Sequence, residues 1–138
     1  MLVGMRDASA EEVRMFHAWR ERTLRDGARG RGTVVDASHE TDWGVRVAST
    51  VPLEYKRTIR MTFPDGSTSD TQETIPLHSV QKLADRRTID CWPQIGERTK
   101  VGATVPVRYD ESDHSHVVLD LPALLEEIFT SLDQSADA

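Results

Sequence analysis

The sequence contains one cysteine, Cys91, so no disulfide within the chain can form and no Cys/His zinc set can be written. No segment approaches the roughly 20 consecutive apolar residues that a helix needs to cross a bilayer. The first residues, MLVGMRDASAEE, carry acids where a secretory signal requires a continuous apolar stretch. These absences predict a soluble cytoplasmic protein that does not insert into membranes and uses no cofactor.

Positive charge is missing from the last part of the chain. Residues 110–138 contain eight acids and no Lys or Arg, whereas residues 1–31 contain seven Arg against five acids. Nucleic-acid affinity comes largely from Lys and Arg that neutralise phosphates, so this distribution disfavours a nucleic-acid partner. A single-stranded nucleic-acid binder of the OB type is a second alternative function, although the aromatic side chains are dispersed among acids and core packing explains them better. Those aromatic residues are Trp43, Tyr55, Phe63, Trp92 and Tyr109.

A length of 138 residues fits one compact domain, and its first element is an amphipathic helix. Ser9 and Glu12 form the S-x-x-E capping box at its start. Asp26 and Gly27 predict a left-handed stop at its end. At 100° per residue the apolar side chains gather on one face; they are Val13, Met15, Phe16, Trp19 and Leu24.

The middle of the chain alternates apolar and polar residues, which is typical of strands with one buried face. Strands are expected at 32–35, 55–63, 67–75, 104–109 and 116–120. One more strand is expected directly after a turn at 43–44. Pro64, Asp65 and Gly66 predict a tight hairpin turn. The polar stretch 36–42 is expected to be a loop. Residues 76–100 are interpreted as a mixed connection in which Pro93 and Gly96 break any long helix.

A second amphipathic helix is expected over 121–138, and it supplies the functional prediction. Its apolar side chains occupy one arc; they are Leu124, Leu125, Ile128, Phe129 and Leu132. A domain of this size has a limited core to share between two apolar helix faces. The C-terminal helix, or an open sheet edge, is therefore predicted to dock on a protein partner or on a second copy. The protein is predicted to be a binding or assembly module without catalytic residues.

The extended segments resemble a widespread family of small bacterial β-domains, the domain-of-unknown-function family three-five-nine-two and its relatives. In that family a G-x-x-V-P-V-x-Y-D segment closes a small barrel. The matching residues here are Gly32–Val35, Asp65, Gly66, Gly102, Val105, Pro106, Val107, Tyr109, Asp110 and Val117–Leu119. Glu111 and His114 stand where the family often has proline. The resemblance spans about residues 29–120 and implies a small antiparallel β-barrel, with no established activity, cofactor or catalytic residue.

One cluster offers an alternative function. The segment DESDHSH brings together carboxylates and a His-x-His pair, and these residue types bind zinc or nickel. Asp110, Asp113, His114 and His116 are therefore the candidate ligands of a metal site or of a metal-dependent hydrolase. A solvated turn between two strands accounts for the same residues without a metal.

Together these observations predict an α+β protein that is mainly β. Its centre is expected to be a small antiparallel barrel of the OB or SH3 type with five or six strands, because short strands leave unpaired edges unless the sheet curls and closes. The expected division is an N-terminal helix in 1–28, a barrel in 29–120, and a C-terminal helix with a polar tail in 121–138.

Overall fold

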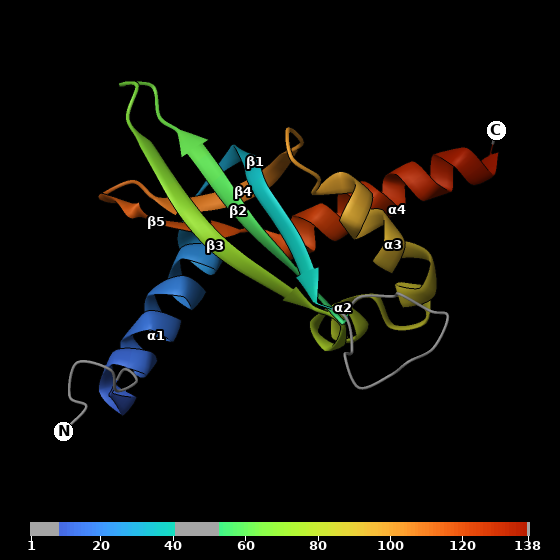
Figure 1. The fold of residues 1–138 in the computed structure, drawn as a ribbon, viewed down its shortest axis with the longest axis horizontal. Helices are drawn as coiled ribbons and strands as arrows, with labels where there is room; N and C mark the ends of the chain where they lie inside the picture. The colour runs from blue at the N-terminus through green and yellow to red at the C-terminus, as the bar shows by residue number, and fades with distance from the viewer. Residues whose placement is uncertain (1–8, 41–52, 138) are drawn as a thin grey trace.

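The computed structural model describes residues 9–40 and 53–137 (Figure 1). The elements follow the order α1 (Ala10–Asp26), β1 (Ala28–Glu40), β2 (Glu54–Thr62), β3 (Thr68–Pro76), α2 (Leu77–Ala84), the short 3₁₀ turn η2 (Asp85–Arg87), α3 (Thr88–Arg98), β4 (Thr104–Asp110), β5 (Asp113–Leu119) and α4 (Leu121–Asp137). Among these residues, no helix combines the length and the apolar character that a membrane crossing requires.

The five strands form one antiparallel sheet in the order β3-β2-β1-β4-β5. Its edge strands, β3 and β5, lie against each other, so the sheet curls into a nearly closed barrel (Figure 1). The predicted antiparallel barrel with a helix at each end is confirmed. The helical share is larger than expected, because residues 77–98 are also helical.

The hairpin between β2 and β3 is confirmed in detail. Its strands pair in register from Glu54 opposite Pro76 to Thr62 opposite Thr68. Gly66 has φ of 89°, the left-handed conformation that a glycine adopts without a steric penalty. The turn sequence and the strand alternation therefore specify this hairpin together.

The start of α1 is confirmed, but the reason for its end is different from the predicted one. The backbone N–H of Ser9 donates to Glu12 Oε1 at 2.9 Å, and the N–H of Glu12 donates to Ser9 Oγ at 3.1 Å. Gly27 is extended, with φ of −69°, and not left-handed. A Cβ at Gly27 would lie 2.4 Å from the carbonyl oxygen of Thr23 and 2.9 Å from that of Tyr109. Glycine is required here because the helix end approaches β4 closely.

Two other expectations are wrong. The stretch from Asp36 to Glu40 is not a loop but the second half of β1, where it pairs with residues 54–58 of β2. The helix α3 runs through both Pro93 and Gly96. A Cβ at Gly96 would meet the Tyr55 ring at 3.0 Å, and the Tyr55 hydroxyl donates to the Trp92 carbonyl at 3.1 Å. Packing against the barrel thus stabilises a helix that its own sequence disfavours. The turn expected at 43–44 and the strand after it lie outside the described residues.

The helix α4 is buried where a docking surface was predicted. Leu124, Leu125 and Ile128 are 1–2 % exposed and belong to the main core, while Phe129 and Leu132 are half-buried against it. Arg87 of η2 lies over the Phe129 ring at 4.3 Å. These side chains pack within the chain, so the reason for assigning them to a partner no longer holds.

Of the two terminal helices, α1 is the one whose apolar side chains are exposed in the described part of the chain. Every residue from Ala10 to Ala18 is exposed, whereas Thr23 is buried and Trp19 and Arg20 are partly buried. In Figure 1 the N-terminal half of α1 extends away from the sheet. The limited core is thus filled by α4, and only the C-terminal half of α1 packs on the barrel.

We predict that Ile128→Ala lowers the free energy of unfolding by about 2–5 kcal/mol, because it removes a fully buried side chain. Urea-induced unfolding measures this cost. Glu126→Ala, an exposed position of the same helix, serves as the control and is expected to change stability by less than about 0.5 kcal/mol. Equal costs for the two variants would contradict the placement of α4 in the core.

Candidate functional site

The helix α1 lies across the seam where the edge strands β3 and β5 meet. Arg20 Nη2 donates to Glu73 Oε1 of β3 at 2.6 Å, and the Thr71 hydroxyl donates to Glu73 Oε2 at 2.6 Å. On the other side of the seam, the Trp19 ring stacks on His116 of β5, with ring centroids 4.1 Å apart and planes 9° apart. One turn of α1 therefore binds both edges of the sheet.

Two carboxylates, those of Asp110 and Asp113, stabilise the turn from β4 to β5, because each accepts hydrogen bonds from a serine. Asp110 Oδ1 accepts hydrogen bonds from the backbone N–H of Ser112 at 2.9 Å and from its hydroxyl at 2.7 Å. Asp113 Oδ1 accepts the same pair from Ser115 at 3.1 and 2.6 Å. These hydrogen bonds lower the pKa of both carboxyl groups, so both are charged at neutral pH.

The four candidate metal ligands are only partly brought together. His116 Nδ1 lies 3.8 Å from Asp110 Oδ2, and His116 Nε2 lies 3.4 Å from Asp113 Oδ2. His114 instead stacks on Phe63 at a centroid distance of 3.8 Å. Across the described part of the chain, no group of three or more His, Cys, Asp or Glu could hold a metal ion. His114 and His116 stack on different aromatic rings, so the four ligands predicted from the sequence do not converge on one metal position.

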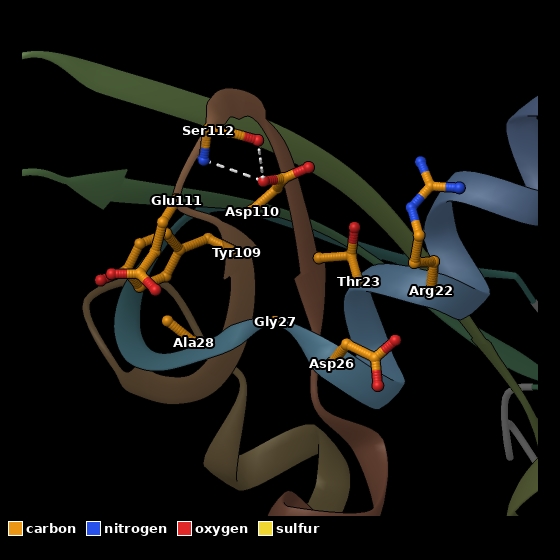
Figure 2. A pocket seen from close by; sticks show the side chains of 9 residues that line it. All are labelled: Arg22, Thr23, Asp26, Gly27, Ala28, Tyr109, Asp110, Glu111 and Ser112. Atoms are coloured by element: carbon orange, nitrogen blue, oxygen red, sulfur yellow. Dashed lines mark hydrogen bonds between the residues drawn. The ribbon is translucent and has the colours of Figure 1, made fainter.

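A pocket of about 310 Å³ opens beside this turn, between the last turn of α1 and the end of β4. Figure 2 shows Arg22 and Thr23 on the helix side and Asp110 on the opposite side. Thr23 is 3 % exposed, and its Oγ1 has no hydrogen-bond partner among the described residues. Sequence reasoning missed the helix side of this pocket, because neither residue belongs to a motif and Thr23 interrupts an otherwise ordinary amphipathic pattern.

Arg108, next to this pocket in sequence, joins both terminal helices to the barrel. Its Nη1 donates to the Gly27 carbonyl at the end of α1 at 2.9 Å, and its Nε donates to Asp120 Oδ2 at 2.9 Å. The other oxygen of Asp120 accepts from the Ala123 N–H at 3.1 Å and so caps α4. One guanidinium therefore sets the positions of the end of α1 and the start of α4.

The remaining sequence candidates lie in the interior. Tyr55, Phe63 and Trp92 are at most 6 % exposed, so they cannot act as a base-stacking platform. Trp43 lies outside the described residues. Cys91 is fully buried, and burial raises the pKa of its thiol, which disfavours the reactive thiolate.

The chain matches no family model, no curated protein and no solved structure. The resemblance of residues 29–120 to the small bacterial β-domains stays a prediction that rests on the closing segment around Pro106 and Tyr109. The function is therefore argued from the geometry alone.

The same aspartate–serine arrangement occurs at Asp65, whose pKa is also lowered by hydrogen bonds from Ser67. A carboxyl group with a depressed pKa stabilises the fold above its ordinary pKa of 3.8, and this contribution is lost as the pH falls through the lower value of the folded state. We predict that Asp65→Asn, Asp110→Asn and Asp113→Asn combined remove part of the acid sensitivity.

Urea midpoints measured from about pH 5 to about pH 2 test this expectation. Asparagine keeps an oxygen that accepts from serine but does not titrate. The midpoint of the unchanged protein should fall more steeply with pH than that of the triple variant. Parallel curves for the two proteins would show that these three carboxyl groups have the same pKa in the folded and unfolded chains.

Proposed function

We propose that this protein is a non-catalytic assembly module that associates with a second copy of itself through the projecting half of α1. The observation that carries the proposal is the exposure of large apolar side chains there: Val13 is 42 % exposed, Met15 62 % and Phe16 48 %. A helical segment this short is marginal in water without a packing partner. Covering its apolar face would stabilise it.

A second apolar surface supports self-association. Between α2 and α3 lies a groove of about 440 Å³ lined by Leu77, Ile89, Trp92 and Pro93, with Ile89 85 % exposed. An amphipathic helix that places its apolar face in a hydrophobic groove is a common mode of recognition. No residue of α1 lines this groove, and in Figure 1 the helices α2 and α3 lie on the other side of the sheet from α1, so α1 does not fill the groove of its own chain.

Two copies that exchange α1 helices would satisfy both surfaces at once. Each α1 would enter the groove of the other copy, and the same contact would occur twice about a twofold axis. This arrangement needs no further protein. It assigns the partner contact to α1, and not to the C-terminal helix that the sequence favoured.

We predict that Met15→Glu weakens self-association by at least about tenfold, because it places a carboxylate in an apolar contact. Sedimentation equilibrium measures the effect. Ala10→Glu is the matched control, since it adds the same charge to an exposed position about 140° from Met15 around the same helix and should leave association unchanged.

The exchange itself is tested by mixing two defective variants. Ile89→Glu should also dissociate the protein, because Ile89 lines the groove. A mixture with Met15→Glu should recover association, since the intact α1 of one variant meets the intact groove of the other. An unchanged protein that stays monomeric, or a mixture that stays dissociated, would contradict the proposal.

A further inference from the structure

The pocket in Figure 2 has the features of a ligand site, independently of self-association. Its volume of about 310 Å³ falls within the range of small-molecule sites. At its base, Thr23 Oγ1 is buried and has no hydrogen-bond partner among the described residues. The figure shows this hydroxyl directed into the space between Asp110 and Arg22. A buried hydroxyl in this position costs stability unless a ligand group forms a hydrogen bond with it.

The Asp110 side of the pocket favours an ammonium group. Asp110 Oδ1 is occupied by Ser112, whereas Oδ2 lies 3.8 Å from His116 Nδ1, which is beyond hydrogen-bond distance. Its side chain is 28 % exposed, so a ligand can reach it. The pocket also lies at the C-terminal end of α1, where the helix dipole favours positive charge. An ammonium could donate to both Asp110 Oδ2 and Thr23 Oγ1.

The helix side favours a carboxylate. Arg22 lines the pocket, is exposed, and has no hydrogen bond or ion pair with any residue in the described ranges. A guanidinium matches the two oxygens of a carboxylate with parallel donors. Figure 2 places the Arg22 guanidinium across the Thr23 hydroxyl from the Asp110 carboxylate. The pocket lining holds one guanidinium, that of Arg22, and three carboxylates, those of Asp26, Asp110 and Glu111. Of the three carboxylates, Asp110 is the one that faces Arg22 across the Thr23 hydroxyl in Figure 2.

We propose that this pocket binds a small amino acid as a zwitterion, with its ammonium at Asp110 and Thr23 and its carboxylate at Arg22. The class covers α-amino acids and those with a longer spacing between the charges. Glycine and β-alanine represent the two spacings. Ethylamine carries only the ammonium charge and propionate only the carboxylate charge, so each represents one half of the zwitterion.

The test is an NMR titration of the full chain with these four compounds at constant ionic strength. We expect at least one zwitterion to shift the backbone signals of residues 22–28 and 109–112 saturably, and more tightly than either half. The spacing that binds identifies the ligand class. Shifts that do not saturate, or equal affinities for a zwitterion and ethylamine, would overturn the proposal.

Three variants assign the contacts. Asp110→Asn should weaken the bound zwitterion by about tenfold or more, whereas Asp65→Asn, which removes a carboxylate from the same kind of turn elsewhere, should not. Arg22→Gln should lower the zwitterion affinity to that of ethylamine. Thr23→Val keeps the shape of the side chain and should weaken binding while the protein stays folded. Equal effects of Asp110→Asn and Asp65→Asn would show that the carboxylate acts through the turn and not on a ligand.

Discussion

Closure of the barrel at the seam between β3 and β5 determines how the two terminal helices are placed. An antiparallel sheet with two free edges must pair, cover or protect them. Here α1 covers the seam, with Arg20 bonded to Glu73 on β3 and Trp19 stacked on His116 on β5. The Glu73 side chain is 5 % exposed, and both of its oxygens accept hydrogen bonds. Removing either partner would leave a buried charge with fewer contacts than it needs.

The two terminal helices have different roles in the closed barrel: α4 fills the core, and α1 covers the seam. The helix α4 starts at Asp120, which Arg108 holds, and it fills the core with Leu124, Leu125 and Ile128. The helix α1 needs only one turn to bind the seam, so its N-terminal half stays exposed among residues 9–40 and 53–137. Both proposals arise from this arrangement, because the projecting half is the proposed assembly surface and the last turn forms one side of the pocket.

The sequence predicted the elements whose signals are local. The Ser9 capping box, the turn at Gly66 and the alternation of β2 and β3 act within a few residues, and each is present as expected. Two amphipathic helices could also be read from periodicity. Periodicity identifies an apolar face but not the surface that covers it, so the choice between α1 and α4 required the tertiary structure.

The candidate site was harder to predict from sequence, because its side chains are positioned by residues far away in the chain. Asp110, Asp113 and His116 are close in sequence, and their proximity was expected. The stacking of His114 on Phe63 depends on a residue that follows β2, some fifty positions earlier in the chain, and no local pattern reveals it. Gly27 was predicted to be a left-handed helix cap, but glycine is needed there because the backbone of Tyr109 comes close. No sequence motif indicated that Thr23 would line a pocket.

One helix, α1, closes the barrel and also carries the proposed assembly surface. Hydrogen exchange along α1, measured at a low and a high protein concentration, distinguishes these two roles of the helix. At low concentration the amides of residues 19–26 should exchange as slowly as those of β5, and the amides of residues 13–18 should exchange much faster. At high concentration the second group should slow while the first stays unchanged. Uniform exchange along α1 that does not depend on concentration would contradict the account.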